Sequence, residues 1–332
     1  MQTVSINIGT LCTPCLNRCR YCLLSYDGKV QGADWDRSCR CARAFYDWLQ
    51  KNRPELSFAF YFGYSMEHPR LLEALDFLRE IGSPTAQFLQ MDGMRMRNQA
   101  ELKQLLAAVK ARGVQLIDFT FYGTRAYHDR FAARQGDYDL MLRALKAAEE
   151  AGLACEIGYP LTQESAPLAE AFLQEIAAYR AERLFFFVPH GEGRGRMMEN
   201  IRLTAKDLEN LPPAALARLN MTRYKPEKEW LHGSFSAPSK RVLTLMLTQE
   251  NIARYESMPP NAVICELEAL DDAYYRAVPP LSELARRYGD PDGDRIFSER
   301  DLYLYYQRRF IAETGLQIHD MNDERQHFSR RF

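Results

Sequence analysis

A chain of 332 residues that is 46% hydrophobic can bury a large core, either as one barrel-sized domain with an appendage or as two ordinary domains. Its 43 Lys and Arg residues balance 44 Asp and Glu residues, so the formal net charge is −1 and nothing global calls for nucleic acid or an anionic membrane as a partner. The N-terminal MQTVSINIGT lacks the basic start and apolar core of a signal peptide, and no apolar run approaches the ~18 residues of a membrane span. We therefore expect a cytoplasmic protein.

Short apolar, β-rich runs alternate with longer segments of helical periodicity. We predict six strands, over residues 4–9, 58–63, 86–91, 117–123, 155–159 and 184–189. Helices that end in glycine are predicted between them, over residues 70–82, 100–113 and 139–152. This alternation is typical of an α/β fold, and six such units fit an open, partial (β/α)6 TIM-like barrel. Chemistry in β/α barrels gathers at the C-terminal ends of the strands.

The pattern changes near residue 200 to helical segments interrupted by proline pairs. We therefore divide the chain into a partial barrel over residues 1–200 and a mainly helical C-terminal region over residues 201–332. Within that region, residues 298–313 begin with a serine that can cap a helix and carry an aspartate in the first turn, both favourable placements.

Three of the eight cysteines lie within the eight residues CLNRCRYC (15–22), spaced C-x3-C-x2-C as Cys15, Cys19 and Cys22. In a reducing compartment, clustered cysteines are more often metal ligands or catalytic groups than disulfides. Soft thiolates select zinc or iron–sulfur clusters. A structural zinc site or a fully ligated cubane takes four protein ligands, whereas three leave one iron open.

A structural zinc site is the alternative, completed by Cys12, because Cys12 and Cys15 form one C-x2-C pair and Cys19 and Cys22 form another. The protein would then be a metal-binding interaction protein and not an enzyme. Zinc modules are usually small and self-contained, however, and a zinc module does not account for the β/α array.

The triad, placed after the first strand of a β/α array with Tyr21 before its last cysteine, resembles the radical S-adenosylmethionine (radical SAM) superfamily. The resemblance implies a [4Fe-4S] cluster held by Cys15, Cys19 and Cys22, with S-adenosyl-L-methionine (SAM) on the fourth iron. It implies reductive cleavage of SAM to a 5′-deoxyadenosyl radical that abstracts hydrogen from a substrate, as in oxidoreductases or transferases of this type. A one-electron reductant such as flavodoxin or ferredoxin is implied as a partner, and Tyr21 as a cofactor contact.

The resemblance covers roughly residues 1–200. After the second strand, FGYSMEHP (62–69) stands where the family has a Gly-Gly-Glu motif that contacts the methionine part of SAM. Gly63 and Glu67 are the contacts implied here, and Tyr64 and Ser65 depart from the usual glycines.

Later strand ends also match the family in part. MDG (91–93) stands where relatives often have Thr-Asn-Gly, FYGTRAYHD (121–129) is similar to the ribose-contacting stretch, CEIGY (155–159) resembles the segment that packs on adenine, and PHGEGRGR (189–196) looks like the Gly-Arg loop. The implied cofactor contacts are Tyr122, Gly123, Ile157, Gly158, Arg194 and Arg196. Either arginine can clamp a carboxylate.

The remaining cysteines and histidines have simpler interpretations. Cys39 and Cys41 are too few to hold a second metal alone, and we expect Cys155 and Cys265 to be buried small hydrophobes, with Cys265 alternatively a hydrogen donor in the site. We expect His128, with Asp129, to open a loop and to cap or hydrogen-bond locally, and His190 is the histidine best placed for substrate contact.

The substrate is open. A small molecule is favoured because the sequence has no cysteine-dense auxiliary-cluster region, and a ribosomally made peptide is the enzymatic alternative.

Overall fold

The computed structural model describes residues 1–10, 15–22, 32–63, 65–191, 193–235 and 239–316. The six predicted strands are all present, as β1 (Gln2–Thr10), β2 (Ser57–Tyr61), β3 (Phe88–Gln90), β4 (Leu116–Thr120), β5 (Ala154–Pro160) and β6 (Arg183–Phe187). They alternate with helices, and the predicted α/β fold is confirmed.

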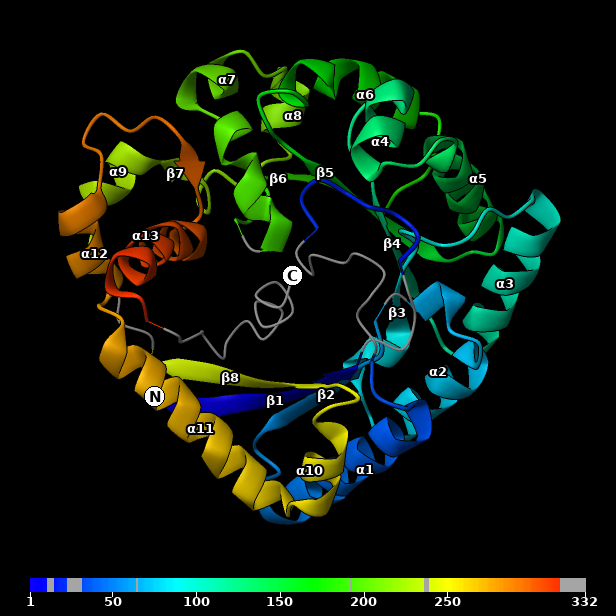
Figure 1. The fold of residues 1–332 in the computed structure, drawn as a ribbon. Coiled ribbons are helices and arrows are strands. Elements are labelled where there is room, and N and C mark those ends of the chain that lie inside the picture. Colours follow the sequence, from blue (N-terminus) through cyan, green and yellow to red (C-terminus); the bar gives the residue numbers. More distant parts are fainter. Residues whose placement is uncertain (11–14, 23–31, 64, 192, 236–238, 317–332) are drawn as a thin grey trace.

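Helices surround the strands in a ring (Figure 1). The helices that follow or precede the first six strands are α1 (Trp35–Asn52), α2 (Leu71–Glu80), α3 (Gln99–Ala111), α4 (Arg125–Ala132), α5 (Asp137–Glu150) and α6 (Ala169–Ile176). Three of them, α2, α3 and α5, match the predicted glycine-terminated helices. Short 3-10 helices connect the rest: η1 (Ser65–Glu67), η2 (Pro84–Gln87), η3 (Ala166–Leu168) and η4 (Gly193–Ile201).

The strands form two parallel sheets and no closed barrel. The first sheet has the order β2-β1-β8 and the second the order β3-β4-β5-β6, with no pairing between β2 and β3 among the described strands. Parallel strands put all their carboxyl ends on one rim, where a site can form.

The C-terminal region contributes a strand that the sequence analysis missed. Strand β8 (Lys240–Leu247) pairs in parallel with β1 along its whole length, from Gln2 opposite Lys240 to Thr10 opposite Leu247. A single parallel bridge also joins Leu219 to Phe186 of β6. Segments beyond residue 200 therefore extend both sheets, and the proposed domain boundary at residue 200 falls within η4.

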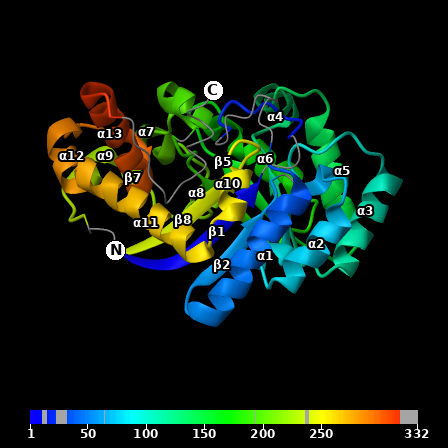
Figure 2. The same cartoon turned by 60° about the horizontal axis from the view of Figure 1, so that its bottom comes forward.

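Helices dominate the remainder of that region. They are α7 (Ala205–Glu209), α8 (Pro213–Leu216), α9 (Glu227–Leu231), α10 (Ile252–Ser257), α11 (Pro260–Ala277), α12 (Leu281–Tyr288) and α13 (Glu299–Thr314), with a small antiparallel pair of β7 (Lys225–Pro226) and β9 (Ile296–Phe297). Helix α13 begins as predicted, because the Ser298 side chain accepts a hydrogen bond from the Asp301 N–H. Figures 1 and 2 place α13 on the inner side of α12.

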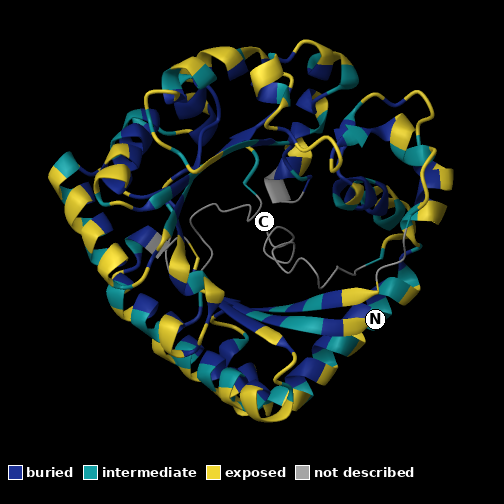
Figure 3. Cartoon of the chain, turned by 180° about the vertical axis from the view of Figure 1, so that it is seen from behind, coloured by how far each residue is buried: buried dark blue, intermediate teal, exposed yellow. Residues whose placement is uncertain are grey.

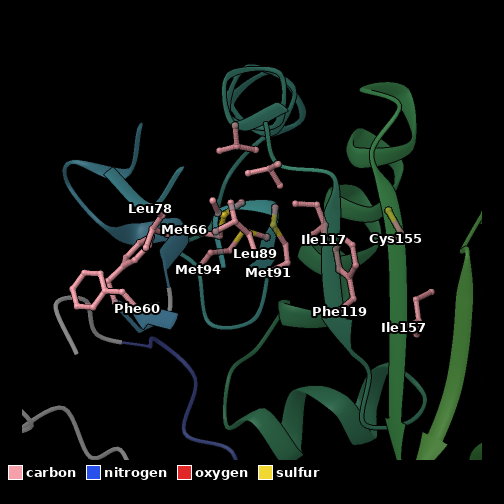
Figure 4. Packing of buried hydrophobic residues seen from close by; sticks show 14 of the residues in the cluster. Phe60, Met66, Leu78, Leu89, Met91, Met94, Ile117, Phe119, Cys155 and Ile157 are labelled. Atoms are coloured by element: carbon pink, nitrogen blue, oxygen red, sulfur yellow. The ribbon is translucent and has the colours of Figure 1, made fainter. Parts of the chain in front are cut away.

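The main core lies between the strands and the outer helices. Alternate strand residues such as Phe60, Ile117, Phe119 and Ile157 are fully buried beneath the helices (Figure 4), and exposed residues gather on the outer helix surfaces (Figure 3). Because side chains alternate along a strand, the intervening residues face the interior of the ring. In the described residues no helix is both long and apolar enough to cross a membrane.

Candidate metal and cofactor site

The backbone of the cysteine segment is fastened to the carboxyl ends of the second sheet. The Leu16 N–H donates to the Gly93 carbonyl just after β3 at 2.8 Å, and the Arg18 N–H donates to the Ala132 carbonyl at the end of α4, also at 2.8 Å. Gly93 has a φ of 70°, and a Cβ there would lie 2.1 Å from the Cys15 Sγ. Glycine is thus required where the strand end meets the first thiol.

The three thiols of the motif are shielded from water and close enough to affect one another. Cys15 is 8% exposed, Cys19 is 9% exposed and Cys22 is half-buried. Burial, with a smaller contribution from the nearby Asp92 and Cys22, raises the pKa of the Cys15 thiol to about 12. Burial likewise raises the pKa of Cys19. A cation bound here would favour the thiolates, so metal binding would release protons.

The donor set fits an iron–sulfur cluster, although the thiols do not form a closed ligand set. Among the described residues, no three Cys, His, Asp or Glu side chains lie close enough together to hold a metal ion. Cys12, the fourth ligand of the zinc alternative, lies outside the described residues. Three cysteines in one short segment at a strand rim are the kind of ligand that such a cluster takes.

An aromatic cluster supports the second cysteine. The Tyr122 hydroxyl is 3.1 Å from the Cys19 Sγ, and its ring stacks on Phe131 with centroids 4.7 Å apart. Tyr21 packs edge-on against Tyr122 at 5.7 Å. The structure thus brings two predicted cofactor residues, Tyr21 and Tyr122, to one predicted metal ligand. Gly123 is adjacent, but a Cβ there would meet Tyr127 at 2.8 Å, so its glycine allows strand–helix packing.

A buried polar network behind the motif was not predicted. The Asn17 amide donates to Asp137 Oδ2 at 2.8 Å, and the same oxygen lies 3.1 Å from His128 Nε2. His128 Nδ1 accepts from the Tyr122 N–H, so Nε2 carries the proton that Asp137 accepts. His128 makes local hydrogen bonds as expected, but it does not open a loop, because it lies fully buried within α4.

The partial Gly-Gly-Glu segment lies beside the loop after β3. Gly63 is exposed and has a φ of 78°, as a strand-to-turn transition requires. The Glu67 carboxylate accepts from the Arg95 N–H at 2.8 Å and forms an ion pair with Arg97, whose side chain is 7% exposed. Glu67 is therefore bound by protein donors in this structure.

The cofactor contacts predicted on β5 and after β6 do not all face the same side of the sheet. Ile157 is fully buried on the helix-facing side of β5, whereas Gly158 faces inward, where a Cβ would lie 3.2 Å from the Phe185 and Phe187 rings. The two are not brought to one face. Arg196 is exposed on η4, and the side chain of Arg194 lies outside the described residues.

The β6 loop also reaches the cysteine segment. A Cβ on Gly195 would lie 1.9 Å from the His190 carbonyl and 3.9 Å from the Tyr21 carbonyl. His190 is half-buried, with its Nε2 3.5 Å from Arg223. The loop that resembles the Gly-Arg loop therefore lies against the residue before Cys22.

The other cysteines are separate from this site. Cys41 is 3% exposed in the core and Cys39 is two residues away on α1, so the two side chains point in different directions. Cys155 is 2% exposed, as expected. The expected burial of Cys265 was wrong: it is exposed, because the buried stripe of α11 runs through Val263, Ile264 and Leu267.

Two carboxyl groups, Asp92 and Asp118, lie near the cysteine segment and were not predicted as site residues. Asp92 is 9% exposed and accepts from the Thr120 N–H and hydroxyl at 3.2 and 3.1 Å. Burial raises its pKa well above the usual range, and the neighbouring Asp118 and Asp137 add to this effect. Burial raises the pKa of Asp118 to about 6. Asp118 had a signal in the polar alternation of the predicted strand over residues 117–123, and Asp92 directly follows the predicted strand over residues 86–91.

No family model matches this chain, and no curated protein matches it. Solved structures do match. SuiB of Streptococcus suis bound to the precursor peptide SuiA gives a TM-score of 0.46 at 11% identity, over 63% of this chain and 44% of SuiB. Native anSMEcpe with bound AdoMet gives 0.42 at 19% identity, over 63% of this chain and 59% of that one. Coproporphyrinogen III oxidase (HemN) from Escherichia coli, a radical SAM enzyme, gives 0.45 at 11% identity, over 93% and 91% of the two chains.

The three structures match this chain at TM-scores below 0.5 and at no more than 19% identity. The chain spans less than half the length of the SuiB chain. The likeness concerns the fold alone, so the function is argued from the residues of this chain.

Proposed function

We propose that the chain is a radical SAM enzyme in which Cys15, Cys19 and Cys22 hold a [4Fe-4S] cluster and SAM binds beside it. The observation that carries the proposal is that the segment with Cys15, Cys19 and Cys22 is hydrogen-bonded at the carboxyl end of a parallel sheet, with the thiols of Cys15 and Cys19 buried. When bound, the cluster and SAM supply the electron transfer and the 5′-deoxyadenosyl radical that abstracts hydrogen from the substrate.

The protein supplies orientation and the exclusion of water. The Tyr122 hydroxyl is placed to donate to the Cys19 sulfur, because a metal-bound thiolate has no proton of its own. Tyr21 and Phe131 pack against each other in the same apolar cluster as Cys19. Glu67, Gly63 and Gly158 remain proposed SAM contacts, and Arg196 a proposed carboxylate contact. Ile157 is no longer included, since its side chain faces the helices.

We infer that the substrate is polar. The inward side of the second sheet carries Gln90, Asp118, Glu156 and Arg183 in one row, each at a register position next to the following one. Gln90 donates to Asp118 at 3.5 Å, and Arg183 pairs with Glu156 at 3.4 Å. Such a wall favours a small molecule with hydrogen-bonding groups.

Anaerobic reconstitution with iron and sulfide tests the proposal. Electron paramagnetic resonance of the reduced protein should show a [4Fe-4S]⁺ signal that changes on adding SAM, and chromatography should detect 5′-deoxyadenosine. Recovery of zinc with no cluster signal would show that the cysteines are structural. If SAM is cleaved in the absence of a substrate, peptide extracts and small-molecule extracts can be added separately. The extract that stimulates SAM cleavage then indicates the class of substrate.

A further inference from the structure

The loop that follows β6 is held from both sides by α13. The Gly191 N–H donates to Asp301 Oδ1 at 2.8 Å, and Arg308 Nη1 donates to the Gly191 carbonyl. A Cβ on Gly191 would lie 2.7 Å from Arg308 Nη2 and 2.9 Å from Glu199 Oε1. The two peptide units on either side of the Gly191 Cα are therefore fixed by a carboxylate and a guanidinium from the same helix, and a larger residue at position 191 would displace the Arg308 and Glu199 side chains.

Asp301 and Arg308 also hold η4, through Arg202 and Glu199. Arg202, with a side chain 3% exposed, donates from Nε and Nη2 to the two oxygens of Glu199 at 2.9 Å each, and it pairs with Asp301. Arg308 Nη2 reaches Glu199 at 3.0 Å. Two arginines and two carboxylates thus neutralise one another in a network that is largely buried, where losing one partner leaves the others uncompensated.

The opposite side of η4 packs on the cysteine segment. Met198 and Ile201 are 4% and 9% exposed, and both belong to the aromatic cluster that contains Cys19 and Tyr122. Contacts therefore run without a break from α13, through η4, to the predicted metal ligands. Residues almost 300 positions apart, Cys19 and Asp301, are joined by this path.

We propose that Asp301 and Arg308 are positioning residues of the cofactor site. They hold the loop over residues 189–191 and η4 against the cysteine segment. Helix α13 therefore helps to position the site. This inference rests on the proposed function for the identity of the cofactor, but the mechanical coupling itself does not depend on the cofactor.

Asp301→Asn keeps an acceptor for the Gly191 N–H and removes the charge that balances Arg202. Arg308→Gln, at a position 31% exposed, removes the clamp on the Gly191 carbonyl with less risk to folding. Glu313→Gln is the matched control, because Glu313 lies on the same helix but pairs with Arg287 at the surface.

Two measurements decide the proposal. In the full-length protein without cofactors, hydrogen exchange by mass spectrometry should rise in residues 189–201 and in residues 15–22 for both variants, and not for Glu313→Gln. In the reconstituted protein, the Kd for SAM should rise about tenfold or more for both variants. The SAM-induced change in the paramagnetic spectrum should need correspondingly more SAM.

If hydrogen exchange in residues 15–22 stays at the wild-type level in both variants, the positioning role is overturned. A wild-type Kd for SAM in both Asp301→Asn and Arg308→Gln would also overturn it. A wild-type protein that takes up no cluster or SAM would instead overturn the proposed function, and the exchange measurement would still judge the coupling. If Asp301→Asn does not fold, Arg308→Gln decides alone.

Discussion

The side-chain amide of Asn17 donates a 2.8 Å hydrogen bond to the Asp137 carboxylate, which links the cysteine segment to the first turn of α5. Both side chains are at most 3% exposed, and Arg134 lies 3.3 Å from the second Asp137 oxygen. The cysteine segment is therefore held by side chains as well as by its backbone bonds to Gly93 and Ala132.

Asn17→Ala should weaken this anchor. Removing a buried donor to a charged acceptor costs about 1–3 kcal/mol, so the free energy of unfolding should fall by that amount in denaturant titrations. Iron content after reconstitution should fall as well, because the segment between two ligands is released. Asn52→Ala, whose amide bonds only the exposed end of α1, should change neither quantity. Full iron content in Asn17→Ala would show that the anchor does not order the ligands.

Cys19→Ala should abolish the cluster. Cys19 is the central ligand of the triad and the one that Tyr122 contacts, so its loss leaves two thiolates. Iron analysis and the absorbance near ~400 nm of the reconstituted protein measure the outcome. Cys265→Ala, at an exposed position on α11, is the control and should retain the cluster. An undiminished iron content in Cys19→Ala would show that Cys19 is not a ligand of the cluster.

Glu67→Ala should weaken SAM binding and leave the cluster in place. The structure adds a reason beyond direct contact: without the carboxylate, the nearly buried Arg97 loses its ion-pair partner and the turn after β2 loses its tie to Arg95. Equilibrium dialysis with SAM and parallel iron analysis separate the two effects. Glu73→Ala, an exposed acid on α2, should bind SAM like the wild type. Unchanged affinity in Glu67→Ala would show that the partial Gly-Gly-Glu match has no role.

Local pattern was enough to predict the six strands, the glycine-terminated helices and the cysteine motif. These features depend on periodicity and spacing within a few residues of chain. The ties between distant segments could not be predicted in this way. Asn17 and Asp137 are 120 residues apart, and Gly191 and Asp301 are 110 apart. Neither pair has a local signal.

The incorrect placement of Ile157 and the missed strand β8 had a similar cause. Ile157 was assigned to the cofactor by its place in a motif, but strand alternation put Gly158 inward and Ile157 under the helices. Strand β8 was missed because a single apolar run in a helical region does not reveal that it pairs with β1, more than 200 residues away. Which edge a strand joins is decided by tertiary packing.

Tyr122→Phe should lower the reduction potential of the cluster. A hydroxyl that donates to the Cys19 sulfur stabilises the more negative, reduced form, and a net bond of about 1 kcal/mol corresponds to about 40 mV for one electron. Anaerobic redox titration monitored by paramagnetic resonance gives the midpoint. Tyr127→Phe is the matched control, since its hydroxyl bonds Glu164 within the same aromatic cluster. Equal potentials for wild type and Tyr122→Phe would show that the hydroxyl does not donate to the bound thiolate.

Asp118→Asn should change how stability depends on pH. Burial raises the folded-state pKa of Asp118 from 3.8 to about 6, so the folded protein binds this proton more tightly than the unfolded chain does. The associated stability is present below about pH 4 and is lost as the pH rises to about 6, by up to about 3 kcal/mol. The variant stays neutral at every pH, so its Tm should match that of the wild type near pH 4 and exceed it above pH 6. Asp47→Asn, at an exposed position on α1, should follow the wild-type profile. A Tm difference between Asp118→Asn and wild type that is the same at pH 4 and pH 8 would mean that the Asp118 carboxyl faces water, and the polar row would then be open to solvent along the inner wall.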